Sequence, residues 1–415
     1  MDPLRELLRA TFQAAVQASQ PDRVLANLTL PEVRGRTVLV SVGKAAPGMA
    51  AAVMGQLHGP VSGVVVAPHA QATGSLPGLH VLGAGHPTPD EGSVRAGAAV
   101  LDAVRALSPD DLLLCLISGG ASALLCAPAG VTLDQKADLT RQLLASGASI
   151  QQINVVRKHL SRVKGGQLAR AAAPARVVSL VLSDVVGDDL SSIASGPTAP
   201  DPSSDRDALA VLEAFGLRAP EARVWLTEGA AGLHPDTPKP DDPLFERVTH
   251  RIVGRNRTAL EAAAAHLQQA GWPARIWRDD VTGPAREAAR QHAQLARELD
   301  PGEALLSGGE TTTVVRPGAG RGGRNLEFLL ALALEDTGVY ALAADSDGLD
   351  GSSDAAGAIL TPDTLARAAR LGLDARASLD GSDAHGFFGR LGDLIRCGPT
   401  GTNVNDVRCL LRAPS

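Results

Sequence analysis

Short apolar runs recur along the first half of the chain, and each is followed by a loop of small residues and a stretch with helical periodicity. The apolar runs lie at 37–42, 61–67, 111–118 and 177–184. The helical stretches lie at 89–107, 133–145 and 150–172. Continuous rather than alternating apolar runs are typical of strands buried on both faces of a parallel sheet. The pattern therefore predicts an α/β fold with a doubly wound, Rossmann-like parallel sheet.

A proline- and aspartate-rich stretch, LHPDTPKPDD at 233–242, interrupts this pattern and marks a boundary or a long loop. A second set of apolar runs and helical segments follows, with runs at 250–254, 274–279, 303–309 and 339–345. We therefore predict two domains, a Rossmann-like domain at 1–235 and a C-terminal α/β domain at 236–415.

Composition narrows the class of protein. Hydrophobic residues make up 44% of the chain and aromatic residues only 2%, so Ala, Val and Leu must fill the core. The net charge of −6 and the scarcity of stacking aromatics argue against nucleic-acid binding. No apolar run is long enough to span a bilayer, and the four cysteines lack CxxC spacing, so we expect a cytoplasmic protein with free thiols. The sequence leaves open whether the protein forms a homodimer.

The turn after the first apolar run is informative. It reads GKAAPG at 43–48, so it lacks the GxGxxG dinucleotide fingerprint, and Lys44 is followed by Ala45 rather than by the Ser or Thr of a Walker A motif. Lys44 is one of only five lysines and lies at the end of a predicted strand. An ammonium group there can stabilise a transferring phosphoryl group.

The sequence Ser-Gly-Gly occurs twice after an apolar run, at 118–120 and at 307–309. Ligands of open α/β sheets bind beyond the carboxyl ends of strands, and glycine lets an anion approach the backbone N–H groups. With the hydroxyl groups of Ser122 and Thr311, both segments predict anion-binding loops.

Charged residues gather at three further points. The segment GAGRGGRNLEFLLALAL (318–334) brings Arg324 and Asn325 to the start of an apolar helix, where both predict contacts to anionic oxygens. Acidic clusters follow predicted strands at 184–189 and 345–354, and their carboxylates predict Mg²⁺ binding or proton transfer.

Two other segments receive structural interpretations. Thr88, Pro89 and Glu91 fit a capping box, so a helix should begin at Pro89. In the helix from Ile150, apolar residues recur at core spacing. We expect Asn154, Arg157, Lys158 and Lys164 on a solvated face, with an anion site as the alternative.

These motifs resemble those of a known family. SVGKAA, GHPTPDEGS, LISGGASALL, INVVRKHLSRVKGGQLA, LLSGGETTTVV, GRGGRNLEFLLALAL, AADSDGLDGSSDAAGA and GPTGTNVNDV occur in the order found in glycerate 2-kinases with a C-terminal MOFRL domain. The resemblance runs from about residue 5 to 412 and places the MOFRL unit at about 300–412. It implies an active site between two α/β domains, ATP and D-glycerate as substrates, and 2-phosphoglycerate as product. It also implies central roles for Lys44 and Arg324.

We therefore expect phosphoryl transfer in which Lys44 and Arg324 neutralise the developing charge and Asp189 (or Asp184) accepts the glycerate proton. Asp345 and Asp347 are expected to hold Mg²⁺. The residues assigned to glycerate are Ser118, Gly119, Gly120, Ser122 and Asn325. The residues assigned to the nucleotide are Ser307, Gly308, Gly309 and Thr311, although the sequence leaves the reverse assignment open. The alternatives are a hydroxypyruvate reductase and a non-catalytic protein that binds phosphorylated ligands.

Overall fold

The computed structural model describes residues 2–314 and 320–414. The chain divides into two compact units. The N-terminal unit comprises 25–183 and 188–253, and the C-terminal unit comprises 1–24, 184–187 and 254–415.

A six-stranded sheet forms the centre of the N-terminal unit, in the order β3-β2-β1-β4-β5-β6. The strands are β1 (Thr37–Val42), β2 (Val61–Pro68), β3 (Leu79–Ala84), β4 (Leu112–Ile117), β5 (Arg176–Leu182) and β6 (Val248–Gly254). The first five pair in parallel. Every residue of β1 and β4 is buried, as their continuous apolar sequences predict.

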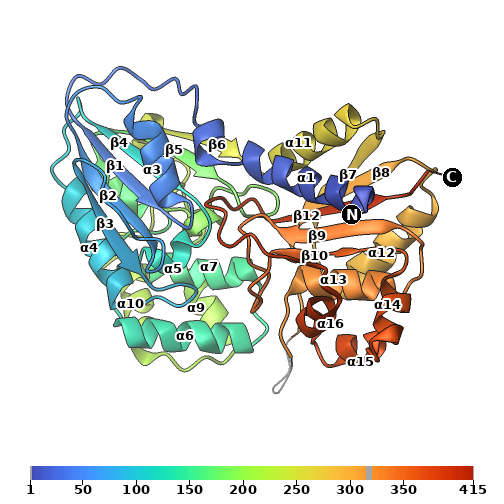
Figure 1. Ribbon diagram of the computed structural model, residues 1–415. Helices are drawn as coiled ribbons and strands as arrows, with labels where there is room; N and C mark the ends of the chain where they lie inside the picture. The colour runs from blue at the N-terminus through green and yellow to red at the C-terminus, as the bar shows by residue number, and fades with distance from the viewer. Residues whose placement is uncertain (1, 315–319, 415) are drawn as a thin grey trace. The chain divides into compact units, whose positions relative to one another are not determined.

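The order of the strands reverses between β1 and β4. The chain proceeds from β1 to β2 and β3, then returns across the sheet to place β4 on the other side of β1. Helix α3 (Ala46–Met54) follows β1 and helix α4 (Glu91–Val104) follows β3, and the right-handed crossovers place these helices on opposite faces (Figure 1). The predicted doubly wound sheet is confirmed, and its reversal creates a crevice at the carboxyl ends of β1 and β4.

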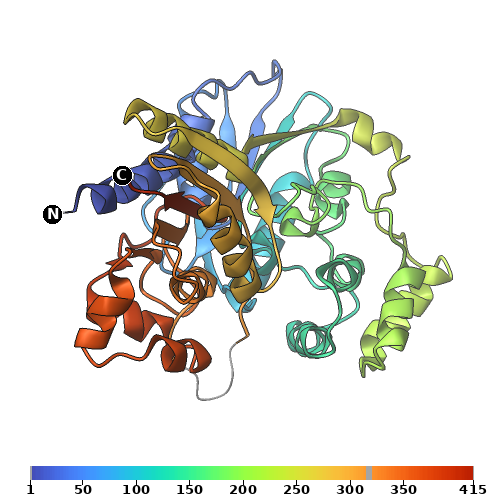
Figure 2. The same cartoon turned by 90° about the vertical axis from the view of Figure 1, so that its right-hand side faces the viewer.

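Helices form a second core in the N-terminal unit. Figure 2 shows this group, in which α7 packs on α6 and α9, and α9 packs on α10. The bounds are α6 (Leu133–Ala145), α7 (Ile150–His159), α9 (Asp205–Ala214) and α10 (Pro220–Ala230). The shorter helices of this unit are α5 (Ala121–Leu124), α8 (Gln167–Ala172), η1 (Ile193–Ser195) and η2 (Pro243–Arg247).

The single helix predicted at 150–172 is wrong, because the chain turns between α7 and α8. Gly165 and Gly166 adopt φ values of +57° and +79°, which a continuing helix does not allow.

The sheet of the C-terminal unit is mixed, in the order β11-β10-β9-β12-β8-β7. The strands are β7 (Ala274–Val281), β8 (Ala304–Gly309), β9 (Tyr340–Asp345), β10 (Gly357–Leu360), β11 (Leu394–Ile395) and β12 (Asp406–Leu411). Strand β12 is antiparallel to both β8 and β9. The start of β12 therefore lies beside the ends of β8 and β9, and Asp406 pairs with Gly309 on one side and Asp345 on the other.

Helices cover both faces of this second sheet. Figure 1 shows α1 and α11 on one face and α13 on the other. The longer helices are α1 (Pro3–Ala18), α11 (Asn256–Gln269), α12 (Ala285–Arg297) and α13 (Arg324–Ala333). The shorter ones are α2 (Pro21–Val24), α14 (Thr364–Arg370), α15 (Ala375–Asp380) and α16 (Ala384–Leu391).

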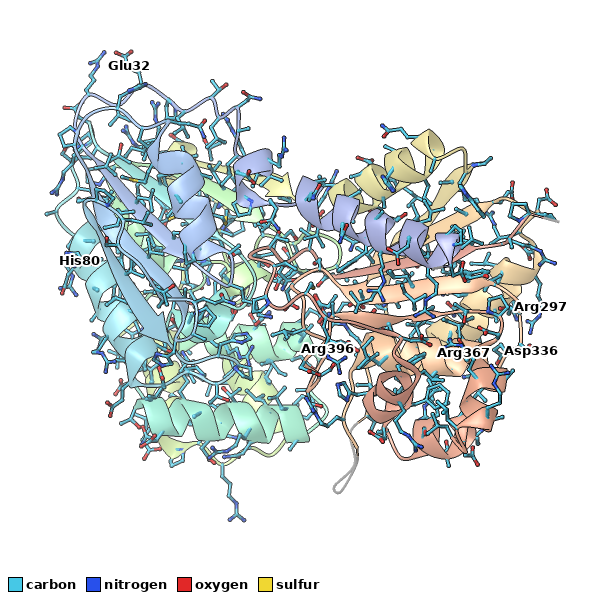
Figure 3. The ribbon with its side chains drawn as sticks, in the orientation of Figure 1. Glu32, His80, Arg297, Asp336, Arg367 and Arg396 are labelled. Carbon is cyan, nitrogen blue, oxygen red and sulfur yellow. The ribbon has the colours of Figure 1, made fainter. Side chains whose placement is uncertain are left out.

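The two units differ in their bounds from the predicted domains. Helix α1 belongs to the C-terminal unit because it packs on α11 and β9, whereas β6 joins the N-terminal sheet beside β5. Charged residues such as Glu32, Arg297 and Asp336 lie at the surface (Figure 3). Across 2–314 and 320–414, no helix combines the length and the apolar character needed to cross a membrane. All four cysteines are free, and only Cys397 among them is exposed.

Candidate functional site

Lys44 and the first SGG segment meet at the crevice between β1 and β4. The backbone N–H of Lys44 donates to the carbonyl of Gly119 over 2.8 Å, and the N–H of Ala45 donates to Ser118 Oγ over 3.1 Å. Gly43 has a φ of +134°, and a Cβ there would lie 2.1 Å from Ser118 Oγ, so only glycine permits this approach. These contacts lock the two turns together and fix Lys44 where doubly wound sheets bind ligands.

Gly120 brings His86 into the same region. Its φ is +84°, and a Cβ there would lie 3.0 Å from His86 Cδ2 and 3.4 Å from Lys44 Cγ. The predicted helix start at Pro89 is wrong, because Asp90 is the N-cap and forms a capping box with Ser93. The segment 86–89 therefore precedes α4.

A cavity of about 380 Å³ borders this turn within the N-terminal unit. Gly120 and Ser122 lie on its wall, together with Lys136, Arg157 and Lys164. Burial lowers the pKa of Lys136 to about 8 and that of Lys164 to about 7, the latter helped by repulsion from Lys136. Cations at these positions make the cavity electropositive.

The expectation of a solvated face for Arg157, Lys158 and Lys164 is wrong. Lys158 and Lys164 are buried, and Arg157 is half-buried. Lys164 is buried against the segment 122–125, to whose carbonyl groups its Nζ donates, and the scarcity of lysine in the chain was the signal that each deserved inspection. Lys158 points elsewhere, since its Nζ lies 3.3 Å from Asp201 Oδ1.

The second SGG segment is not a loop, because Ser307–Gly309 are the last residues of β8. A Cβ at Gly308 would lie 1.6 Å from Asn256 Oδ1, so this glycine accommodates a neighbouring side chain. His292 Nε2 lies 2.7 Å from Ser307 Oγ, and Arg408 Nη2 donates to Thr311 Oγ1 over 3.1 Å. These hydroxyl groups make contacts inside the C-terminal unit.

Arg324, the first residue of α13, lies among carboxylates. Its Nη2 is 2.6 Å from Asp345 Oδ2, its Nε is 2.9 Å from Asp406 Oδ1, and its Nη1 is 3.3 Å from Glu310 Oε1. Burial lowers the pKa of Arg324, but attraction to Asp406, Asp345 and Glu310 raises it overall. The predicted approach of Arg324 to an anion therefore requires part of the guanidinium to remain accessible, and its side chain is 20% exposed.

Asp406 was missed by sequence reasoning. It is fully buried and accepts hydrogen bonds from Arg324, Asn325 and Arg408. Asp406 does not follow an apolar run but begins a strand that runs antiparallel to both of its neighbours. The motif GPTGTNVNDV, which ends just after Asp406, was the available signal.

Asn325, assigned to glycerate from the sequence, is buried. Its Nδ2 donates to Asp406 Oδ1 over 2.7 Å, and its backbone N–H donates to Asp350 Oδ1 over 3.1 Å. Asp350 also accepts from the N–H of Leu326 over 2.9 Å, so this carboxylate caps α13. Burial raises the pKa of Asp350 to about 6. Gly318 and Ala319 of the predicted glycine-rich loop lie outside the described residues.

The two predicted metal ligands lie together. Asp345 is buried, and its Oδ1 accepts from the backbone N–H of Asp347 over 3.0 Å. Burial and repulsion from Asp347 raise the pKa of Asp345 well above its usual value. Two adjacent carboxylates that repel each other are a donor set that suits Mg²⁺, which proteins bind through one or two carboxylates plus substrate phosphates.

The predicted proton acceptor is a weaker base than an ordinary aspartate. Asp189 accepts from Ser192 Oγ over 2.6 Å and from Ser191 Oγ over 2.9 Å. Burial raises the pKa of Asp189, but these hydrogen bonds lower it overall. Asp184, the other candidate, belongs to the C-terminal unit and accepts from Asn403 Nδ2 over 3.4 Å.

Another group of potential metal ligands lies in the N-terminal unit. Among the described residues, atoms of His159, Asp205 and Asp236 lie within 4.8 Å of one another. Lys239 Nζ is 3.1 Å from Asp236 Oδ2, and the pKa of His159 is raised by Asp236 despite its burial. Two basic groups therefore pair with Asp236, whereas Asp205 Oδ2 is buried without a hydrogen-bond partner among the described residues.

Comparisons with known proteins show the family. Residues 7–227 match a family described as "Domain of unknown function (DUF4147)", and residues 303–406 match the MOFRL family. A D-glycerate 2-kinase from Thermotoga maritima is 40% identical over 98% of this chain and 98% of its own. The chain belongs to the glycerate kinase family.

Solved structures agree with this family. The crystal structure of a glycerate kinase from Thermotoga maritima matches with a TM-score of 0.88 at 37% identity, covering 99% of each chain. Members of the glycerate kinase family nevertheless carry different names. A relative from Agrobacterium vitis, 46% identical over 98% of this chain and 94% of its own, is provisionally named a hydroxypyruvate reductase.

Proposed function

We propose that this protein is an ATP-dependent glycerate 2-kinase. The observation that carries the proposal is its full-length similarity to a D-glycerate 2-kinase, together with Lys44 fixed at the crevice between β1 and β4. The 2-hydroxyl oxygen of D-glycerate attacks the γ-phosphorus of ATP, the bond to the bridging β–γ oxygen breaks, and ADP leaves. The products are 2-phosphoglycerate and ADP.

In this proposal Lys44 and Arg324 act on the same phosphoryl group. Its transition state is loose, with negative charge spread over the equatorial oxygens, so catalysis is mainly positioning and charge stabilisation. Lys44 supplies a compact ammonium charge from the N-terminal unit. Arg324 supplies a planar guanidinium whose orientation is fixed by Asp406 and Asp345.

Asp345 and Asp347 are the residues proposed to hold Mg²⁺, which would neutralise phosphate charge when bound. The role of Asp189 as acceptor of the glycerate hydroxyl proton stays a prediction. Its hydrogen bonds with Ser191 and Ser192 weaken it as a base, but a loose transition state places little demand on base strength before the phosphoryl group has moved.

A single assay tests the proposal. Purified protein is mixed with ATP, Mg²⁺ and D-glycerate, ADP release is followed, and ³¹P NMR identifies the phosphoglycerate. We expect ADP and 2-phosphoglycerate in equal amounts. Oxidation of NADH by hydroxypyruvate without any ADP release would instead identify a reductase, and formation of 3-phosphoglycerate would refute the proposed regiochemistry.

A further inference from the structure

The cavity beside the first SGG turn carries positive charge that no carboxylate in its wall balances. Lys136, Arg157 and Lys164 line it, and none of the described lining residues is acidic. Arg141 also lines the cavity, but it forms an ion pair elsewhere, because its Nη2 lies 3.0 Å from Asp138 Oδ1. Buried charges are normally paired, so this arrangement calls for a negatively charged ligand.

The hydrogen bonds of these cations support the same conclusion. Lys136 Nζ donates to the carbonyl of Leu160, and Lys164 Nζ donates to the carbonyls of Ser122 and Leu125 over 2.8 and 3.3 Å. Within the described part of the chain, the guanidinium of Arg157 has no hydrogen-bond or ion-pair partner. Neutral carbonyls hold the two lysine side chains in place and contribute no negative charge to the cavity.

The size and the apolar part of the cavity indicate more than a small acid. About 380 Å³ lies in the range of sites for drug-sized ligands, and a three-carbon acid would leave most of it empty. Leu133, Ala137 and Leu144 form an apolar side, and Leu144 is 61% exposed. An exposed leucine beside a cationic wall suits a ligand with a flat apolar ring and a polyanionic tail.

We infer that this cavity binds the nucleotide, with the phosphates against Lys136, Arg157 and Lys164 and the base against Leu133 and Leu144. Gly120 lies in the wall of the cavity, and a Cβ there would be 3.4 Å from Lys44 Cγ, so the terminal phosphate would point towards Lys44. The inference rests on the proposed function, because it locates the phosphoryl donor of that reaction.

This assignment reverses the one drawn from the sequence. There, the residues assigned to glycerate were Ser118, Gly119, Gly120, Ser122 and Asn325, and those assigned to the nucleotide were Ser307, Gly308, Gly309 and Thr311. The structure favours the reversal because the second SGG segment is a paired strand whose hydroxyl groups contact His292 and Arg408. The first is a turn beside a cationic cavity.

Calorimetric titration of the full-length protein with ADP tests the inference without any turnover. Arg157→Gln and Lys164→Met should each raise the ADP dissociation constant by about 10- to 100-fold, the effect of losing one charged hydrogen bond. Lys239→Met is the matched control. It also removes one positive charge from the N-terminal unit, but Lys239 pairs with Asp236 outside the cavity, so ADP binding should stay unchanged.

The outcomes separate this inference from the proposed function. Unchanged ADP affinity in Arg157→Gln and Lys164→Met, in protein that still forms 2-phosphoglycerate, overturns the inference alone. A raised KM for D-glycerate with unchanged ADP affinity would place glycerate in the cavity and also overturn it. Thermal unfolding of each variant, together with partial rescue by Arg157→Lys, excludes loss of folding as the cause.

Proton uptake gives a second readout. At pH 8 Lys164, whose pKa burial lowers to about 7, is mostly neutral, and an adjacent phosphate would favour its charged form. The other groups that influence it are Lys136, Arg157 and Cys126. ADP binding should therefore take up protons, seen as a binding enthalpy that varies with the ionisation enthalpy of the buffer. Lys164→Met should reduce this uptake, and an undiminished uptake would contradict the role of Lys164.

Discussion

The two units carry the same tripeptide near the end of a buried strand and use it differently. In the N-terminal unit, Ser118–Gly120 form the turn beyond β4, beside Lys44 and a cavity lined by cations. In the C-terminal unit, Ser307–Gly309 complete β8, and the nearby arginine lies among carboxylates. A glycine pair thus predicts an anion site only where the strand has ended and its neighbours leave the backbone accessible.

The charges of the two regions are opposite in character. The cationic cavity of the N-terminal unit suits an anion, whereas Arg324 in the C-terminal unit lies among the carboxylates of Glu310, Asp345 and Asp406, beside the proposed Mg²⁺ ligands Asp345 and Asp347. Phosphoryl transfer requires both, since the phosphates must be bound and their charge must be neutralised.

The largest effect should come from the buried carboxylate of the C-terminal unit. Asp406→Asn removes the negative charge that Arg324 shares with fully buried Arg408, and it takes from Arg408 its ion pair among the described residues, a loss that typically costs about 3–5 kcal/mol. Urea denaturation should show this as a lower free energy of unfolding. Glu310→Gln, which removes a half-exposed contact to the same arginine, should cost at most about 1 kcal/mol. Equal losses in the two variants would mean that burial does not govern this ion network.

Lys44 should matter for rate rather than for stability. Lys44→Met removes a charge from the phosphoryl site, and loss of one such group lowers kcat by about 10²- to 10³-fold. The measurement is initial-rate kinetics with saturating ATP and D-glycerate, with Lys239→Met as the control that should retain wild-type kcat. Near-normal kcat in Lys44→Met would remove Lys44 from the mechanism.

A smaller loss of stability should come from the middle glycine of the second SGG segment. Gly308→Ala forces a Cβ against Asn256, and overpacking of this kind typically costs about 1–3 kcal/mol of unfolding free energy. Gly55→Ala is the control, because no atom lies within 4 Å of its Cβ position and its φ is −70°. Thermal denaturation should show a loss for Gly308→Ala only. A stable Gly308→Ala would indicate that Asn256 can move and that packing does not require this glycine.

Much of this arrangement could be predicted from the sequence, and the failures have physical causes. Continuous apolar runs predict buried strands such as β1 and β4. Lys44 was found because it lies just beyond such a run. Asp406 was missed because antiparallel pairing is a long-range property that brings the start of one strand to the ends of two others. Lys164 was expected on a solvated face because the pattern predicted one helix to residue 172, whereas α7 ends at His159 and Lys164 lies beyond it, against the carbonyls of Ser122 and Leu125.

The central proposal is that Lys44 and Arg324 act on one phosphoryl group. A double-mutant cycle on kcat tests it most directly, with Lys44→Met, Arg324→Lys and the combined variant, where lysine keeps a positive charge beside Asp406. Groups that stabilise one transition state are strongly non-additive. The account predicts that the combined variant is scarcely slower than the slower single variant. Rate losses that simply multiply would show that the two residues act independently and would contradict it.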